Sequence, residues 1–359
     1  MGSLFSLLSE ELMIKILEEL PLKLLCRLRA VYKSWERLLT SRLLVPHLCR
    51  QPFHLFLQHR HGYDVTTLFG FGRVTTLFGF GFDLSRKVAY EEIQFHHAGI
   101  SCFTCGDGII CCLKLSEPDL LAIANPLTEE DLFPLPKLEL IVLNFGFHVD
   151  PITRNFKVLA RTGTHGYQYI NAFWIFDSSK WNWRLLKDQL PDVTMRHREP
   201  LVIRSFVESQ SGKEEFLVSF DIGREEWEII DTPLKLIEER DVYLSNKIQE
   251  WNGWLSYATV PVKNLQAWIW VLSDEKKWLR VMKTNLKELG LSNYILYPTL
   301  WLGETLVLRT EDTEDEEFIT LNIETGDLKT FPSYQVQEYV MYQPTLLSWK
   351  KKGKVKLEP

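Results

Sequence analysis

The sequence predicts an α+β multidomain chain, in which a small helical module precedes a mainly β domain with the pattern of a β-propeller of about six blades. Apolar residues recur at helical spacing in residues 9–46, whereas short β-like segments separated by Asp, Asn, Gly, Ser and Pro fill the rest of the chain. One strand–turn–strand motif also recurs there at a period typical of propeller blades. We therefore expect a helical module at 1–50, a β domain at 51–349 and a basic tail at 350–359.

The helical module begins at Ser9, whose hydroxyl can cap a helix that has Glu10 and Glu11 in its first turn. Pro21 ends this helix because it has no N–H to donate. The apolar stripes are Leu12, Met13, Ile16, Leu17 and Leu20 in the first helix, and Leu24, Leu25, Leu28, Val31 and Trp35 in the second. About 40 residues are too few for a private core, so these stripes must pack on the rest of the chain or on another protein.

From Leu8 to Trp35 the chain reads L-x-x-E-L-x-x-x-I-L-x-x-L-P-x-K-x-L-x-R-x-R-x-V-x-K-S-W, which closely resembles the F-box. The sequence downstream resembles the F-box-associated interaction domain of plant F-box proteins. Ser9 stands where the F-box pattern has proline, and Tyr32 stands where it has cysteine. The resemblance implies a non-catalytic substrate receptor of an SCF-type ubiquitin ligase, bound through its F-box to the adaptor subunit and, through that subunit, to the cullin scaffold.

The resemblance also implies which residues bind the adaptor. They are Leu12, Ile16, Leu17, Leu20, Pro21, Leu25, Leu28, Val31 and Trp35. Some of them must hold the module together, so they cannot all face the partner. The β domain would capture a target protein that the sequence does not identify.

Two other functions stay open at this point. The first is an interaction scaffold that uses the F-box outside a ligase. The second is a propeller hydrolase with paired carboxylates. The chain has no G-x-S-x-G, H-E-x-x-H or P-loop motif, and all nine histidines lie at or before His197. We therefore predict no catalytic residue and no cofactor.

The repeated motif is an apolar strand, a polar turn, and a strand that opens on a large apolar or aromatic residue. It occupies residues 122–136, 173–186, 218–230, 268–282 and 319–331. The turns start at Asn125, Asp177, Asp221, Asp274 and Asn322, in steps of 52, 44, 53 and 48 residues. We expect each copy to be a hairpin that buries its aromatic residue against a neighbouring blade. Because propellers often pair their terminal strands, we also expect residues 53–58 to pair near residues 345–349.

Most of the tryptophans, eleven of which lie in residues 174–349, are expected in the core. Two pairs are less clear. Trp268 and Trp270 share one face of a predicted strand. Trp251 and Trp254 are separated by Asn252-Gly253, which is typical of a turn. We expect one of the two to project from a loop. Trp is favoured at binding hot spots, so this pair is the candidate target-binding site.

The segment HHxxxxCxxC, from His96 to Cys105, raises the question of a metal site. One CxxC without a second spaced pair is a weak zinc signal. The alternative, a hairpin that turns at residues 106–108, is favoured, and we predict no metal. The sparse cysteines favour a reducing compartment, which for this chain is the cytoplasm, the nucleus or both.

Three further features have simple interpretations. The repeat VTTLFGFG at 65–72 and 74–81 should be absorbed as a long hairpin or loop. The start of the chain, MGSLFS, fits the N-myristoylation pattern, which is short enough to arise by chance. Residues 51–359 carry 33 Lys and Arg against 42 Asp and Glu, and this net charge of −9 disfavours non-specific binding of nucleic acid. No run of apolar residues approaches the length of a membrane span.

Overall fold

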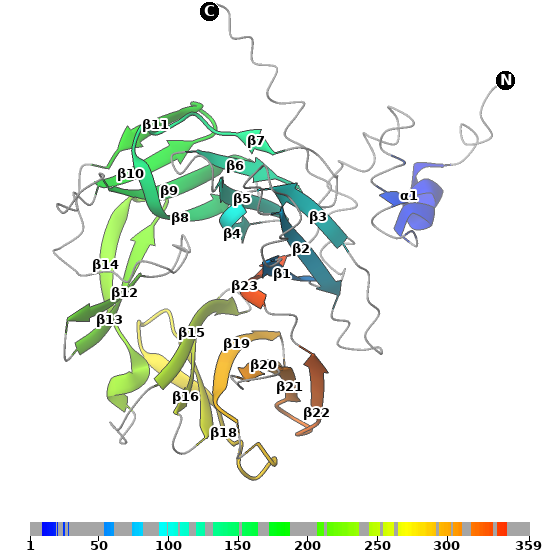
Figure 1. Cartoon of the computed structure of the whole chain (residues 1–359), viewed down its shortest axis with the longest axis vertical. Coiled ribbons are helices and arrows are strands. Elements are labelled where there is room, and N and C mark those ends of the chain that lie inside the picture. Colours follow the sequence, from blue (N-terminus) through cyan, green and yellow to red (C-terminus); the bar gives the residue numbers. More distant parts are fainter. Residues whose placement is uncertain are drawn as a thin grey trace, which may run out of the picture.

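The computed structural model places two kinds of structure in the order expected, a helix near the N-terminus and then antiparallel sheets arranged in a ring (Figure 1). The residues it describes are 9–18, 20, 24–25, 28, 54–60, 74–81, 93–98, 100–106, 108–114, 120–125, 132–150, 153–163, 172–186, 207–211, 214–236, 244–251, 254–261, 265–291, 294–302, 304–310, 317–332 and 336–342. Both predictions about fold class, a helical module and a mainly β propeller, are confirmed.

Helix α1 (Glu10–Glu18) starts where the sequence predicts. The Leu12 N–H donates to the Ser9 hydroxyl over 3.3 Å, and the Met13 N–H donates to the Ser9 carbonyl over 3.0 Å. Ser9 is therefore the N-cap. Although the F-box pattern has proline at this position, the Ser9 oxygens accept hydrogen bonds from N–H groups in the first turn of the helix.

The strands form six antiparallel sheets, each contributing one blade. The first blade contains β23 (Val336–Tyr342), β1 (His54–Arg60), β2 (Val74–Gly81) and β3 (Ile93–Ala98). The second contains β4 (Ile100–Gly106), β5 (Ile109–Lys114), β6 (Leu121–Ala124) and β7 (Phe133–Pro134). The third contains β8 (Ile141–Val149), β9 (Phe156–Gly163), β10 (Ala172–Asp177) and β11 (Asn182–Leu185).

The remaining three blades follow in chain order. The fourth contains β12 (Val207–Ser211), β13 (Glu214–Asp221) and β14 (Glu226–Asp231), with the 3-10 helix η3 (Pro233–Leu236) after it. The fifth contains β15 (Leu244–Trp251), β16 (Trp254–Pro261), β17 (Gln266–Leu272) and β18 (Trp278–Asn285). The sixth contains β19 (Leu296–Leu302), β20 (Thr305–Thr310), β21 (Glu317–Asn322) and β22 (Leu328–Pro332).

The ring closes through the first blade. There β1 lies between β2 and β23, with His54 opposite Tyr342 and Leu57 opposite Tyr339 in the register of β1 and β23. Pairing between the two ends of the β domain was expected, but the partner strand ends at Tyr342, before the expected segment 345–349, which lies outside the described residues. Because β1 has a partner on each side, the N-terminal strand is an interior strand of its sheet.

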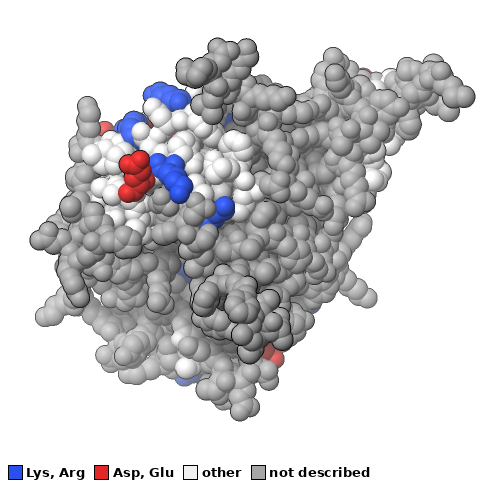
Figure 2. Space-filling view, turned by 45° about the horizontal axis from the view of Figure 1, so that its top comes forward, with Lys and Arg blue, Asp and Glu red and all other residues white. Residues whose placement is uncertain are grey.

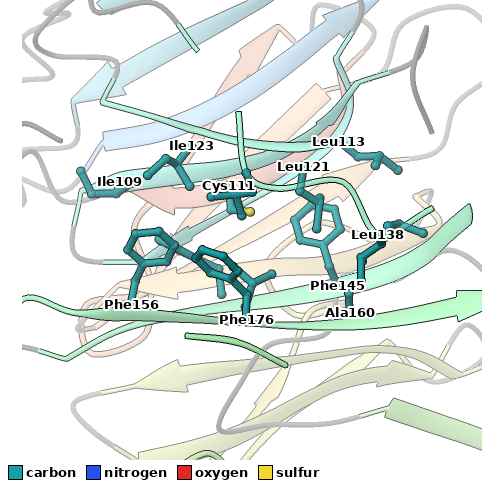
Figure 3. Packing of buried hydrophobic residues seen from close by; sticks show 14 of the residues in the cluster. Ile109, Cys111, Leu113, Leu121, Ile123, Leu138, Phe145, Phe156, Ala160 and Phe176 are labelled. Atoms are coloured by element: carbon teal, nitrogen blue, oxygen red, sulfur yellow. The ribbon is translucent and has the colours of Figure 1, made fainter. Parts of the chain in front are cut away.

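The core lies in the seams between blades. Ile109, Cys111 and Leu113 alternate along β5 onto one face and pack on Phe156, Val158 and Ala160 of β9 (Figure 3). The opposite side chains, Ile110 and Cys112, are also fully buried, since β5 is covered on both faces. This double burial explains why strands such as β5 show continuous apolar runs instead of alternation.

The cysteine-rich segment is the hairpin of β4 and β5, as favoured from the sequence. The Cys111 side chain lies in the core between the second and third blades, and the Cys112 thiol donates to the Ala122 carbonyl over 3.5 Å. In the repeat at 65–81, the second copy is β2, paired on both sides; the first copy lies outside the described residues.

Each copy of the repeated motif forms the outer hairpin of a blade, so the hairpin prediction is confirmed. Three of the turns share one geometry. The side chains of Asp177, Asp221 and Asn322 each accept backbone N–H bonds from residues two or three positions later in the chain, and each residue's carbonyl accepts an N–H from the fifth residue of the turn. Such side-chain acceptors stabilise the turn locally.

The fifth residue of these turns has a left-handed backbone. It is Trp181 at φ 54°, Glu225 at φ 63° and Gly326 at φ 75°. We expect Gly326→Ala to lower the free energy of unfolding by about 1 kcal/mol, because a Cβ is strained at this φ although it meets nothing closer than 3.9 Å. Gly223→Ala, in the equivalent turn of the fourth blade but outside the left-handed region, should cost less, because its Cβ would lie 3.3 Å from the Asp221 Oδ1, a side-chain atom that can shift. Equal losses for the two variants in urea unfolding would contradict this explanation.

Indole N–H groups join consecutive blades. The Trp183 Nε1 donates to the Pro136 carbonyl over 2.7 Å, and the Trp278 Nε1 donates to the Asp231 carbonyl over 2.6 Å. Trp278 is the first residue of its outer strand, and Trp183 is the second residue of its outer strand. In both pairs the carbonyl belongs to the preceding blade. The expected burial of aromatic residues against a neighbouring blade is thus supplemented by a hydrogen bond.

We expect Trp183→Phe to lower the free energy of unfolding by about 1–2 kcal/mol, because it removes the donor and leaves the Pro136 carbonyl without it. Trp254→Phe is the matched control, since that side chain is 40% exposed, and should change stability by less than about 0.5 kcal/mol. Urea denaturation measures both. A Trp183→Phe variant as stable as the parent would show that the hydrogen bond contributes nothing.

Candidate functional site

Two surfaces are candidates for function, the apolar side of α1 and the exposed aromatic residues of the ring. On α1, Leu12 and Ile16 lie one turn apart and are 46% and 42% exposed, whereas Leu17 on another face is 3% exposed. The helix therefore shows an apolar outer stripe and a buried inner contact.

Six of the nine sequence-predicted adaptor-binding residues lie in the described part of the chain. Leu12 and Ile16 face outward, Leu20 and Leu28 are half-buried, and Leu17 and Leu25 are buried. Pro21, Val31 and Trp35 lie outside the described residues. Since some residues must hold the module together, Leu17 and Leu25 fit that role.

Leu24 is an exposed residue that the predicted site omitted. It is 40% exposed, while its neighbour Leu25 is completely buried. Both residues belong to the second apolar stripe of the sequence, and helical spacing alone did not tell which of the two faces outward. Leu24 thus joins Leu12 and Ile16 as exposed apolar surface of the helical module.

The exposed aromatic residues of the ring lie on one rim. In each four-stranded blade the first and third turns lie at the same end of the strands, because neighbouring strands are antiparallel. Trp254 starts the second strand of its blade and Trp181 lies in a third turn; both are 40% exposed. His54 at the start of β1 pairs with the end of β23, so the chain enters the ring from the helical module at this same rim.

The predicted target-binding pair is placed only in part. Trp251 and Trp254 are opposite each other at the end of the hairpin of β15 and β16, and residues 252–253 between them lie outside the described residues. The Trp254 side chain is exposed, and the side chain of Trp251 lies outside the described part of the structure. Sequence analysis missed Trp181, whose ring packs edge-on against Phe133, Phe156 and Phe176 while its outer side faces solvent.

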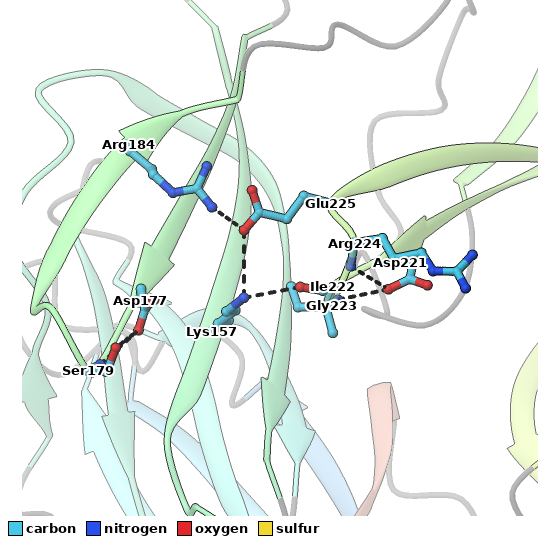
Figure 4. Close-up of polar contacts among 9 residues, drawn as sticks. All are labelled: Lys157, Asp177, Ser179, Arg184, Asp221, Ile222, Gly223, Arg224 and Glu225. Atoms are coloured by element: carbon cyan, nitrogen blue, oxygen red, sulfur yellow. Dashed lines mark hydrogen bonds and ion pairs between the residues drawn. The ribbon is translucent and has the colours of Figure 1, made fainter.

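Charged side chains join the third and fourth blades near this rim (Figure 4). The Glu225 carboxylate in the turn of the fourth blade contacts Arg184 on β11 and lies 3.7 Å from the Lys157 Nζ on β9. The Lys157 Nζ also donates to the Ile222 carbonyl over 3.1 Å. Because these side chains are partly exposed, the ion pairs contribute little to the stability of the fold.

Two described groups have clearly altered pKa values. Burial raises the pKa of Asp177, but the hydrogen bonds from Ser179 and the charges of Lys157 and Lys180 outweigh it, so the Asp177 pKa lies below its usual value. Burial lowers the pKa of the Arg161 guanidinium on β9. Asp177 is also the turn acceptor described above, so its altered pKa has a structural explanation.

Among the residues whose positions are described, His, Cys, Asp and Glu side chains do not gather in groups of three or more that fit a metal ion. On the face turned forward in Figure 2, basic and acidic side chains lie close together on the described surface.

No helix in the described portion is long and apolar enough to span a membrane.

Comparison with known proteins gives two family matches. Residues 5–46 match the F-box domain, and residues 83–332 match the F-box associated beta propeller domain. The ring described above is larger than the second match, because β1 and β2 precede residue 83 and β23 follows residue 332.

Individual proteins agree with these matches. The Arabidopsis thaliana protein At5g62060, which is named as an F-box protein, is 27% identical over 154 residues. The match covers 40% of this chain and 47% of that protein, so the chain spans about half the length of this curated relative.

The solved structures that this chain matches include TolB from Acinetobacter baumannii, with a TM-score of 0.49 and 11% identity over 85% of this chain and 71% of that chain. Another is the Dos1 propeller, with a TM-score of 0.35 and 12% identity over 73% of this chain and 68% of that chain. The family matches cover the helical module and most of the ring. The chain therefore belongs to the plant-type F-box proteins, in which an F-box precedes an F-box associated β-propeller domain.

Proposed function

We propose that this chain is the substrate-recognition subunit of an SCF-type E3 ubiquitin ligase. Residues 1–50 dock on the adaptor subunit and, through it, on the cullin scaffold, and residues 51–349 hold a target protein; residues 350–359 are a basic tail. The observation that carries this proposal is the outward apolar stripe of α1, Leu12 and Ile16, within the segment that matches the F-box.

The adaptor contacts follow from that stripe. Burying Leu12, Ile16 and Leu24 against a partner removes apolar surface that the isolated chain leaves in water. Leu17 and Leu25 are buried and hold the module together, and Leu20 and Leu28 are half-buried. Pro21, Val31 and Trp35 complete the proposed docking set.

The mechanism assigns no bond-making step to this chain. Ubiquitin transfer takes place elsewhere in the complex, and the receptor raises the local concentration of the target's lysines near the charged conjugating enzyme. A target contact at Trp251 and Trp254 fits this role, because that hairpin lies on a rigid scaffold with an exposed aromatic side chain. The proposed location of the protein is the cytoplasm, the nucleus or both.

Affinity purification of the tagged full chain under proteasome inhibition tests the function. We expect the adaptor, the cullin and at least one protein that accumulates under inhibition to co-purify. A purification that retains the adaptor and lacks the cullin would favour the interaction scaffold, and one that lacks both would refute docking through the F-box.

A further inference from the structure

The outer strands of the blades differ in how well their free edges are protected. Most are short, interrupted by proline or acidic. β7 has two residues and ends in Pro134, β11 has four residues, and β22 ends in Pro332. β14 carries Glu226, Glu228 and Asp231 and no basic residue. Short strands and prolines keep sheet edges from pairing, and a run of one charge excludes segments of like charge.

Among the outer strands that the structure describes, β18 has the longest edge. It has eight residues, WLRVMKTN, with no proline and no acidic residue, and it is the last strand of its sheet, paired with β17. Leu279 and Val281 are 55% and 49% exposed. Its edge is therefore long and apolar enough to accept another strand.

Two anchors hold this strand in place while its middle faces solvent. At the start, the Trp278 indole donates to the Asp231 carbonyl of the preceding blade. Farther along, Met282 is 7% exposed and packs in the core between the fifth and sixth blades. A preformed strand loses little conformational entropy when a partner binds it.

A β-bulge explains why the exposed residues are consecutive. Ile269 pairs with Met282 and Trp270 pairs with Arg280, so Val281 is the extra residue of β18. An extra residue interrupts the alternation of sides along a strand. Leu279, Arg280 and Val281 consequently all reach solvent instead of alternating between core and surface.

The charge of this edge selects among partners. Arg280 and Lys283 are both exposed, and the Arg280 guanidinium lies 5.9 Å from the centre of the Trp270 ring, which orients it. With two positive charges and no negative one on the strand, the edge attracts acidic segments. It also repels a second copy of itself, since antiparallel pairing of two such edges would bring like charges together.

We propose that the free edge of β18 is a docking site for an extended segment of the target protein in which acidic residues alternate with apolar ones. The segment adds to the fifth blade as a further strand, with its acidic side chains on the face of Arg280 and Lys283 and its apolar side chains on the face of Leu279. Val281, the extra residue of the bulge, adds exposed apolar surface beside them. Backbone hydrogen bonds supply affinity and the alternate side chains supply specificity, as in other cases of strand addition. This inference rests on the proposed receptor function and specifies its substrate class.

The test uses the full chain in complex with the adaptor and a fluorescent synthetic peptide of alternating Glu and Val. We expect saturable binding that weakens as salt increases, and no binding of the matching peptide of alternating Lys and Val. Arg280→Glu with Lys283→Glu should weaken binding at least about tenfold. The control, Arg224→Glu with Lys329→Glu, makes the same change in net charge at exposed positions outside β18 and should leave affinity unchanged.

A second pair of variants separates the apolar contribution from charge. Leu279→Ser with Val281→Ser should also weaken binding at least about tenfold, and circular dichroism should show that the ring still folds, because both side chains are already exposed. Hydrogen exchange should show new protection at residues 278–285 when the peptide binds, and none in β14 or β22.

Three results would overturn the proposal: equal binding of the Glu and Lys peptides, full affinity in the charge-reversed variant, or new protection at another strand. Self-association that the Leu279→Ser, Val281→Ser variant abolishes, with no peptide binding, would assign the edge to a second copy instead. Failure of peptide binding with adaptor binding retained would refute the β18 site alone, whereas loss of adaptor binding in the parent chain would refute the receptor function.

Discussion

A chain that begins at residue 51 should fold into a soluble, β-rich domain, whereas a chain that begins at residue 61 should not. The first fragment keeps β1, and the second loses it. Because β1 lies between β23 and β2, its removal leaves two unpaired strand edges and opens the ring. Total stabilities of roughly 5–15 kcal/mol leave little margin for the loss of an interior strand.

The same logic supplies a control at the other end of the chain. A cut after residue 342 keeps β23 and should be tolerated, and a cut after residue 335 should be as damaging as the cut at 61. Circular dichroism, size-exclusion chromatography and urea unfolding measure the outcome. A fragment from residue 51 with a mainly helical spectrum, or equal behaviour of the fragments starting at 51 and 61, would contradict closure through β1 and β23.

Leu12→Ser with Ile16→Ser should weaken binding to the adaptor at least about thirtyfold while the ring stays folded. Both side chains are exposed in the chain alone, so their loss creates no cavity, and each would bury apolar surface worth about 1–2 kcal/mol in the complex. Calorimetric titration of the purified chain with the adaptor measures the change. Leu20→Ala with Pro21→Ala should have the same effect through the helix end.

Glu11→Gln is the matched control for this variant. Glu11 is exposed on the same helix but on another face, so its substitution should leave adaptor affinity within about twofold of the parent. Two double variants test the interface, Leu12→Ser with Ile16→Ser and Leu20→Ala with Pro21→Ala. If both bind the adaptor as well as the parent does, the adaptor interface lies elsewhere on the chain.

Local sequence signals predicted much of the fold. The cap at Ser9, the hairpin of β4 and β5 and the outer hairpins of five blades depend on residues close together in the chain, such as Asp177 and the backbone N–H groups that follow it. Propensity and turn chemistry are expressed over such short distances, and so the sequence can show them.

Features that depend on how distant segments meet were harder to predict. We expected the two ends of the β domain to pair, but the exact register of β1 with β23 depends on how many strands complete the ring. Whether Leu24 or Leu25 faces outward depends on what the helical module packs against. The bulge at Val281 depends on how β18 pairs with β17, so local sequence did not predict the exposed edge of β18.

Co-purification of the chain with the adaptor and the cullin N-terminal region, followed by light scattering on a sizing column, tests the receptor function most directly. We expect a single equimolar complex of the three proteins with the parent chain, and a free chain beside an intact adaptor–cullin complex with the Leu12→Ser, Ile16→Ser variant. A parent chain that elutes alone, or a variant that stays in the complex, would contradict docking through the outward stripe of α1.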